Sequence, residues 1–406
     1  MKEIKFSDLY LEPSKNGLSI KFVDDFLGYK IVNMKELFAF PIIKEEVEMR
    51  KVRLSHNEIN RFKLKKGDLL FGRRSLVFDG AGKSTLFNSV EENVIFESSI
   101  IRVRVDESKA YPMYLKYFFE SPYGKSKIWA IIAGTAVFGI RSSDLANIKF
   151  NLPEINTQQK IAFILSVYDE LIENNKQRIK LLEEMAEEIY KEWFVRLRFP
   201  GYENTKIVDG LPEGWENGTI GDLVEFKKGK NITLDTVSEG NVPVVAGGLT
   251  PAYYHNVANT ISPTITISAS GANAGFVNLY YEDIWASDCS FLDSKSTDTL
   301  FFFYLTLKTR QNEVFFLQKG SAQPHVYPKD IMTLKMKIPS NDLIEKFEDL
   351  VFTFFEEIKI LSQKNQLLQE TRDLLLPRLI SGKLSVAHLV DKVEELGMVA
   401  EPREIN

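Results

Sequence analysis

The stretch Asn156–Trp193, NTQQKIAFILSVYDELIENNKQRIKLLEEMAEEIYKEW, decides the fold because a second copy of it lies further along the chain. Shifting the sequence by 186 positions places residues 134–184 on residues 320–370 without a gap. Stacked repeats have periods of about 20 to 50 residues, so this longer period indicates duplicated domains. The chain is therefore expected to consist of two similar halves that each end in this stretch.

Both copies show the apolar pattern of a coiled-coil helix, in which apolar residues recur at alternating steps of three and four. Asn175 interrupts this seam in the first copy and Asn365 in the second. A polar residue in a coiled-coil seam usually fixes the register of the helices or the choice of partner helix. The predicted seams are Leu165, Tyr168, Ile172, Ile179, Leu182, Ala186, Ile189 and Trp193, and then Val351, Phe354, Ile358, Leu361, Leu368, Leu375 and Leu379.

The ends of the two helices carry their own signals. Asn156 with Gln159, and Asp342 with Glu345, form variants of the capping box just after a proline. Pro377 is expected to end or kink the second helix after Leu376.

Each seam needs a partner to bury it, and the chain between the two copies must leave one helix and return to the other. An antiparallel pair of helices with a globule at each end satisfies both needs. The alternative is that both copies are ordinary core helices of a larger fold.

The predicted fold class is α+β, with two mixed α/β globules, a pair of long antiparallel coiled-coil helices and an internal pseudo-twofold repeat. Strands are expected at Ser19–Val23, Leu69–Phe71, Val94–Phe96, Ile100–Val105, Val242–Val245, Thr264–Ser268, Gly275–Tyr280 and Ile284–Ala286, and shorter helices at Tyr111–Glu120 and Thr299–Arg310. The predicted boundaries are 1–155 for the first globule, 156–199 for the first helix, 200–212 for a linker rich in Gly and Pro, 213–340 for the second globule, 341–385 for the second helix and 386–406 for a tail.

Composition predicts a soluble cytoplasmic protein. Apolar residues make up 44% of the 406 residues, which is enough for packed cores, and the N-terminus has no apolar signal segment. Cys289 is the single cysteine, so an intrachain disulfide or a cysteine zinc site is excluded. The net charge is −5, yet residues 1–155 hold 25 Lys and Arg against 20 Asp and Glu, so the first globule is basic.

Motifs of catalysis are missing from the sequence. Gly80–Thr85 (GAGKST) resembles the end of a phosphate-binding loop, but Val77 stands where that motif needs a glycine. His56, His255, His325 and His388 are scattered, and no HExxH, GxSxG or paired Cys/His pattern occurs. We therefore expect a chain without a cofactor, a metal site or catalytic residues, which binds rather than reacts.

Candidate binding residues occur at comparable places in the two globules. Paired arginines suit guanine and lysines suit phosphate, although each charge alone is more simply explained as a solvated surface group. Tyr253, Tyr254 and His255 are expected in a loop. The full set of expected DNA-binding residues is Arg73, Arg74, Lys83, Ser84, Arg141, Lys227, Lys230, Ser270, Asn273, Tyr253, Tyr254, His255, Gln323 and His325.

Over nearly its whole length the chain resembles the specificity subunit of type I restriction–modification systems. None of the similar fragments is a catalytic signature, but their order is distinctive. The first globule departs from the pattern at Gly134–Gly139 (GTAVFG), where Val137 and Phe138 replace the Gln323 and Pro324 of the second. The fragments are Gly67–Arg74, Trp193–Gly201, Leu211–Trp215 with Ile220–Leu223, Gly320–His325 and Leu376–Lys383.

The resemblance implies that each globule is a target-recognition domain for one half of a split sequence in double-stranded DNA. It implies that the helices are spacers that dock two methyltransferase subunits, which carry S-adenosylmethionine and methylate adenine. Two restriction and translocase subunits would add ATP- and Mg²⁺-dependent cleavage. The competing classes are a coiled-coil scaffold with two protein-interaction domains and an enzyme with an unfamiliar site; salt-dependent binding to duplex DNA separates the scaffold from the specificity subunit.

Overall fold

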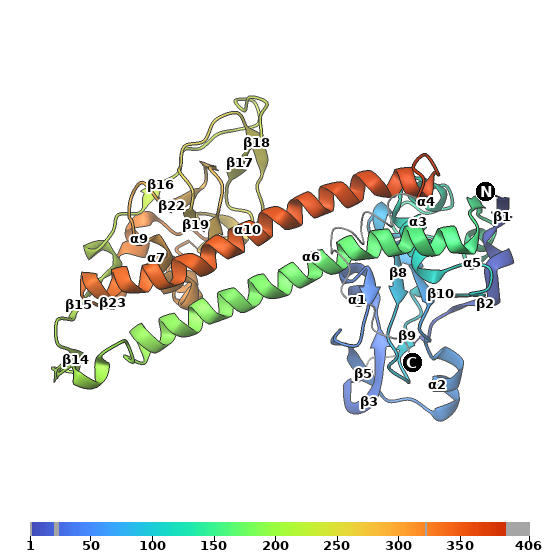
Figure 1. Ribbon diagram of the computed structural model, residues 1–406, viewed down its shortest axis with the longest axis horizontal. Coiled ribbons are helices and arrows are strands. Elements are labelled where there is room, and N and C mark those ends of the chain that lie inside the picture. Colours follow the sequence, from blue (N-terminus) through green and yellow to red (C-terminus); the bar gives the residue numbers. More distant parts are fainter. Residues whose placement is uncertain (1, 20–23, 321–322, 387–406) are drawn as a thin grey trace. The chain divides into compact units, whose positions relative to one another are not determined.

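The computed structural model describes residues 2–19, 24–320 and 323–386, and the chain forms two compact units (Figure 1). Unit 1 comprises residues 1–173 and 365–406, and unit 2 comprises residues 174–364. Two long helices, α6 (Ile155–Tyr190) and α10 (Asn341–Ile380), contribute residues to both units. Each unit is therefore built from one globular segment and from parts of both long helices.

Unit 1 is organised around a five-stranded sheet of order β2-β10-β6-β8-β4, in which the inner strand β10 is antiparallel to both its neighbours, β2 and β6. Successive residues of β10 face opposite sides, as a period of two requires. Ile101 and Val103 pack in the large core of unit 1, to which α3 and both long helices also contribute side chains. Ile100 packs in a separate, smaller core. A three-stranded sheet, β5-β3-β9, completes the globule.

The elements of unit 1 have these bounds. The strands are β1 (Lys2–Lys5), β2 (Tyr10–Asn16), β3 (Asp24–Val32), β4 (Ile42–Ile43), β5 (Arg50–Val52), β6 (Asp68–Gly72), β7 (Arg74–Ser75), β8 (Ser84–Phe87), β9 (Ile95–Phe96), β10 (Ile100–Val105), β11 (Phe138–Gly139) and β12 (Lys149–Leu152). The helices are α1 (Met34–Ala39), α2 (His56–Phe62), α3 (Pro112–Glu120), α4 (Pro122–Trp129) and α5 (Ser142–Ala146).

Unit 2 repeats this plan. Its main sheet has the order β16-β22-β19-β20, and in its small sheet β17 is antiparallel to β18 and parallel to β21. The small sheet of unit 1 has the same arrangement, because β3 is antiparallel to β5 and parallel to β9. Unit 1 also holds α1, β4 and α2, for which the described part of unit 2 has no counterpart.

The elements of unit 2 have these bounds. The strands are β13 (Ile207–Val208), β14 (Leu211–Pro212), β15 (Glu216–Thr219), β16 (Lys227–Lys228), β17 (Val242–Val245), β18 (Tyr253–His255), β19 (Thr264–Ser268), β20 (Val277–Tyr280), β21 (Trp285–Ala286), β22 (Cys289–Asp293) and β23 (Lys335–Ile338). The helices are α7 (Leu300–Thr309), α8 (Gln311–Phe316) and α9 (Pro328–Met332).

The long helices confirm the predicted seams and the antiparallel pair. Every predicted seam residue is buried or half-buried. In unit 1, Asp169 of α6 contacts Arg372 of α10, with 2.6 Å between Oδ1 and Nη1. In unit 2, Arg178 contacts Glu357 at 2.7 Å, so a later residue of α6 meets an earlier residue of α10. The two helices therefore run in opposite directions.

The capping boxes were placed one residue too late, and the second helix does not end at Pro377. The helices begin at Ile155 and Asn341, one residue before the expected capping boxes. At the first start it is the buried Gln158 that forms the contacts, because its side chain accepts from the Tyr111 amide at 2.8 Å and donates to the Pro153 carbonyl at 2.9 Å. Pro377 lies inside α10, which continues to Ile380 because Leu379 and Ile380 are buried in the core of unit 1.

Four further expectations differ from the structure or lie outside it. Tyr253–His255 forms the strand β18, paired with β17, rather than a loop. The expected strand Ser19–Val23 and the tail fall almost entirely outside the described residues. The predicted linker contains the hairpin β13–β14. The ring of Phe199, before the linker, stacks on that of Trp215, after the linker, with 5.5 Å between the ring centroids. The linker is therefore fixed at both ends by packing.

Glu348 of α10 ties the long helix to the N-terminus of α7 in unit 2. Its two carboxylate oxygens accept hydrogen bonds from the amides of Phe301 and Phe302, both at 2.9 Å. The first amides of a helix have no partner within the helix, so this carboxylate satisfies two of them. Burial raises the pKa of Glu348 to about 7, and the two amide hydrogen bonds oppose that rise only in part.

This raised pKa predicts a pH-dependent free energy of unfolding. Glu348 stays protonated in the folded chain up to about pH 7, whereas it ionises near its ordinary value of 4.5 once unfolded. The folded state therefore binds more protons between those values, and stability falls as pH rises from about 4.5 to 7 and is flat above. Glu348→Gln should remove this fall. Urea unfolding followed by tryptophan fluorescence between pH 5 and 8 measures it, and an identical pH dependence in both proteins contradicts it.

Candidate nucleic-acid interface

In unit 1 the paired arginines lie on a short ribbon at the end of the main sheet. Arg73 follows β6, and Arg74 in β7 lies opposite Gly139 of β11. The loop before β11 closes through reciprocal hydrogen bonds between Ala133 and Gly139, both at 2.9 Å. Arg74 is exposed, Arg73 is half-buried, and Arg141 is exposed just before α5. The ribbon thus brings all three predicted arginines to one end of the globule.

Unit 2 has the same ribbon with different side chains. Ser270 follows β19 as Arg74 follows β6, and it lies opposite His325, which stands 186 positions after Gly139. Lys319 and His325 close the loop as Ala133 and Gly139 do. Gly320 and its counterpart Gly134 both have positive φ, +98° and +111°, which glycine adopts without strain. The repeat therefore extends from the helices to the loops.

The polar candidates of unit 2 gather around this loop. The Ser270 hydroxyl donates to the Asp288 carboxylate, and the Gly271 amide donates to the Pro324 carbonyl at 3.2 Å. Asn273 donates to the Gly247 carbonyl at 3.5 Å. The ring of His325 stacks on Tyr327 at 5.9 Å. Gln323 is exposed on the same loop. These residues present amide, hydroxyl and imidazole groups, which suit hydrogen bonds to base edges.

A second group of unit 2 candidates lies on and just after β16 of the main sheet and on β18 of the small sheet. Lys230 is exposed, with its Nζ 5.9 Å from the centre of the Trp285 ring, and Lys227 donates to the Ser296 hydroxyl at 3.0 Å. The Tyr253 hydroxyl donates to the carbonyl of Ile232, whereas the Tyr254 side chain is exposed. Exposed lysine and tyrosine side chains suit contacts with the phosphate backbone.

Two predicted residues are not on the surface. Ser84 is buried in β8, the strand that follows the Gly-rich stretch, so only Lys83 of that stretch is exposed. His255 is buried in β18, where its Nδ1 accepts a hydrogen bond from the Ser238 amide at 3.1 Å. Its ring meets Trp285 edge-on at 5.1 Å. Both residues are buried, so neither lies on the exposed surface where the DNA contacts were expected.

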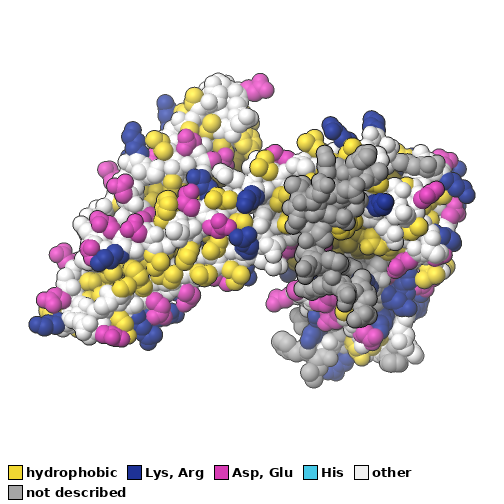
Figure 2. Space-filling model, viewed as in Figure 1, with side chains coloured by type: hydrophobic (Ala, Val, Ile, Leu, Met, Phe, Trp, Pro, Cys, Tyr) yellow, Lys and Arg dark blue, Asp and Glu magenta, His cyan; other side chains and the backbone are white. Residues whose placement is uncertain are grey.

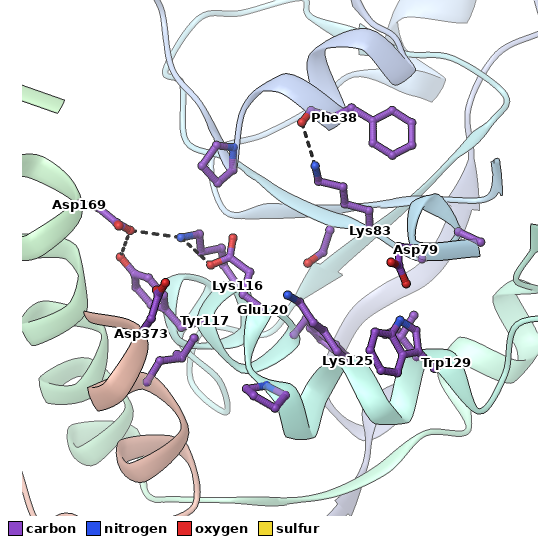
Figure 3. Close-up of a pocket in the computed structure, with 18 of the residues that line it drawn as sticks. Phe38, Asp79, Lys83, Lys116, Tyr117, Glu120, Lys125, Trp129, Asp169 and Asp373 are labelled. Atoms are coloured by element: carbon purple, nitrogen blue, oxygen red, sulfur yellow. Dashed lines mark hydrogen bonds and ion pairs between the residues drawn. The ribbon is translucent and has the colours of Figure 1, made fainter. Parts of the chain in front are cut away.

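A pocket of about 760 Å³ opens beside Lys83 in unit 1 (Figure 3). Lys83 donates to the carbonyl of Phe38 at 2.9 Å. Lys125 and Trp129 project from α4 toward Asp79. No group of three or more His, Cys, Asp or Glu that could hold a metal ion occurs among residues 2–19, 24–320 and 323–386. The pocket thus offers charges and an aromatic wall but no recognisable metal site.

The floor of this pocket is a network of charges that joins α3, α6 and α10 within unit 1. The buried Lys116 contacts Glu120 at 2.9 Å and Asp169 at 3.3 Å, and the Tyr117 hydroxyl donates to Asp169 at 2.7 Å. Burial acts to raise the pKa of Asp169, but Lys116 and the hydrogen bonds from Arg372 and Tyr117 outweigh it and lower the pKa. The carboxylate is therefore held ionised, which suits a structural junction.

Sequence reasoning missed one exposed feature. Phe78, Trp129 and Phe138 form a cluster of rings beside the arginines of unit 1, with centroids 5.5 to 6.3 Å from that of Phe78. The available signal was the apolar run Leu76–Phe78, which follows Arg74 after one serine, because three consecutive apolar residues are unusual at a turn.

Comparison with known proteins agrees with this architecture. The family model described as the type I restriction modification DNA specificity domain matches residues 24–184 and again 212–370. The specificity subunit of type I restriction enzyme MjaIX from Methanocaldococcus jannaschii is 27% identical over 307 residues, which cover 68% of this chain and 70% of that one. The putative MjaX specificity subunit of the same organism is 23% identical over 400 residues, covering 93% and 92%.

A solved structure supports the fold separately. The crystal structure of the S subunit of a type I restriction–modification system from M. genitalium matches with a TM-score of 0.61 at 20% identity, covering 93% of this chain and 95% of that one. Two tandem DNA specificity domains that share a pair of long helices define the class of protein. The chain belongs to the type I restriction–modification specificity subunit family.

No helix among the described residues is long and apolar enough to cross a membrane.

The charge network of unit 1 gives a stability prediction. Asp169→Asn should lower the stability of unit 1 by about 2 to 4 kcal/mol, because it leaves the buried Lys116 and Arg372 with too little negative charge. Glu357→Gln is the matched control on the other helix: it breaks an ion pair whose side chains are 53% and 40% exposed, and it should cost about 0.5 kcal/mol or less. Hydrogen exchange of α3 measures the first effect. Equal protection of α3 in both variants contradicts the assigned role.

Proposed function

We propose that this chain recognises a bipartite sequence in double-stranded DNA, with one half-site read by each globule. The observation that carries the proposal is the repeated ribbon, on which Arg74 and Gly139 in unit 1 correspond to Ser270 and His325 in unit 2. The two ribbons share a backbone arrangement but differ in side chains. A target with two different half-sites requires two similar backbone arrangements that carry different base-contacting side chains.

The chain acts in this proposal as the non-catalytic specificity component of a larger complex. Two methyltransferase subunits with S-adenosylmethionine modify adenine, and two restriction and translocase subunits use ATP and Mg²⁺. The relatives are named as specificity subunits of type I restriction enzymes, which supports this division of labour. The complex works in the cytoplasm, where it meets DNA. This chain supplies DNA contacts and docking surfaces.

Exchange of one globule tests the proposal that each globule recognises its own half-site. Replacing residues 213–338 by the corresponding segment of a relative should change one half of the methylated motif and leave the other half intact. Methylome sequencing of cells that express the hybrid with its methyltransferase subunit shows the motif. Simultaneous change of both halves contradicts one half-site per globule. Methyl transfer by the purified chain alone contradicts the non-catalytic role.

The duplex-binding step separates this function from that of a scaffold. Binding of the purified complex to duplex DNA that contains the motif should weaken steeply with added salt, because lysines and arginines that neutralise phosphates release counterions. The scaffold alternative gives neither a methylated motif nor salt-dependent binding.

The long helices offer a surface for the partner subunits. Besides its buried seam, α10 exposes Ile360, Leu367 and Leu374, which follow one another at seven-residue spacing. In unit 2, α6 exposes Leu181 and Met185. Hydrophobic side chains are visible along the helical part of that unit in Figure 2. A second apolar stripe at heptad spacing suits an amphipathic helix of a partner, which would complete a helical bundle.

Charges in this stripe should release the partner. The double variant Leu367→Glu and Leu374→Glu changes side chains that are 62% and 63% exposed, so the fold should persist. We expect the methyltransferase subunit to be lost from the co-purified complex. Leu234→Glu changes an exposed leucine of unit 2 away from the long helices and should retain the partner. Full retention by the double variant contradicts docking on this stripe.

A further inference from the structure

Unit 1 carries an exposed apolar tip beside its paired arginines. We define the apolar tip as Leu76, Val77, Phe78, Trp129, Val137 and Phe138. Leu76 is 80% exposed, and Phe78 and Trp129 are 42% and 45% exposed. A cluster of exposed apolar side chains costs solubility, so it usually marks a contact surface.

The fold builds this tip from two separate loops. The Ser75 hydroxyl accepts a hydrogen bond from the Val77 amide at 3.1 Å, which folds the end of β7 into a turn. Phe78 on that turn meets Phe138 of β11 edge-on at 5.5 Å and lies 6.3 Å from Trp129 of α4. The β7–β11 pairing holds the two loops together. The tip is therefore an ordered surface in which rings support one another.

The two segments that carry the tip are rich in positive charge. Residues 72–83 and 125–141 hold six Lys and Arg against the single carboxylate Asp79. Their excess of five positive charges equals that of residues 1–155 as a whole, which hold 25 against 20. Within the described part of the chain, no carboxylate forms an ion pair with these six cations, which are Arg73, Arg74, Lys83, Lys125, Lys127 and Arg141. The two segments that carry the exposed apolar residues are therefore strongly basic.

The matching place in unit 2 has a different chemistry. Gln323 and Pro324 stand where unit 1 has Val137 and Phe138, and Ser270 stands where it has Arg74. Residues 269–277 contain no charged side chain. These three positions of the second globule are therefore uncharged, although Lys319, which is paired with Asp330, lies on the same loop. The first globule presents an apolar centre within a cationic rim.

We infer that the apolar tip enters the major groove of the half-site read by unit 1 and recognises thymine through its 5-methyl group. This inference rests on the proposed function. The cationic rim matches the phosphates on either side of the groove, and the apolar centre matches the one apolar group that base edges present there. An apolar protein surface as occupant would offer no negative charge to match these six cations. Duplex DNA satisfies both features of the site together.

Uracil provides the test, because it differs from thymine only by the missing methyl group. The motif is first obtained by methylome sequencing, and exchange of residues 213–338 assigns the half-site of unit 1. Binding of the complex of the full chain with its methyltransferase subunit is then measured on duplexes with deoxyuridine in place of thymidine in one half-site at a time. Substitution in the half-site of unit 1 should weaken binding about three- to fivefold for each contacted methyl group. Substitution in the other half-site should change binding less than twofold.

Variants of the tip complete the design. Leu76→Ser and Phe78→Ala should weaken binding to the thymine duplex and remove the difference between thymine and uracil. Val90→Ser is the matched control, because Val90 is an exposed valine of the same unit outside the tip and should bind as the unchanged chain does. Urea unfolding that matches the unchanged chain shows that the tip variants fold.

The outcomes are distinguishable. A complex that binds no bipartite duplex refutes the proposed function itself. Two outcomes refute only the inference about the tip. In the first, binding of the motif depends on salt but is the same with uracil as with thymine. In the second, the half-site of unit 1 contains no A·T pair. Loss of the methyltransferase subunit from Leu76→Ser, with DNA affinity of the remaining complex unchanged, identifies the tip as a protein contact and also overturns the inference.

Discussion

Burial of the apolar seams of α6 and α10 is the constraint on which the rest of the structure depends. A helix of 36 or 40 residues with a heptad seam is unstable alone in water and needs a partner along its length. The core of unit 1 takes Leu165 from α6 and Leu379 from α10, and the core of unit 2 takes Ala186 and Phe347. Each globule is thus completed by both long helices.

Polar contacts set the detail of this packing. In unit 1 the ionised Asp169 collects Lys116, Tyr117 and Arg372. In unit 2, Glu348 holds the first amides of α7. Both carboxylates project from a long helix toward the globule, and each satisfies groups that burial would otherwise leave without partners. Such contacts specify one arrangement, whereas apolar burial alone tolerates several.

In the proposed function, a shared backbone arrangement with divergent loops lets one duplicated domain serve two half-sites. The strand order, the senses of pairing and the ribbon at the end of the main sheet agree between the units. The core fixes the backbone arrangement, because its residues contact one another. The ribbon side chains contact solvent and are free to differ, as Arg74 and Ser270 do. Specificity can therefore change without cost to the fold.

The sequence by itself determined the duplication, the antiparallel helices and the strands β10, β17 and β19, because strong heptad and period-two patterns are local and repeat by 186 positions. It also placed Arg74 and Ser270 at comparable points. Only the tertiary structure decided that His255 and Ser84 are buried and that α10 passes through Pro377, because burial depends on residues distant in sequence. The same holds for the ring cluster of Phe78, whose partners lie 51 and 60 positions away and meet it only through the pairing of β7 with β11.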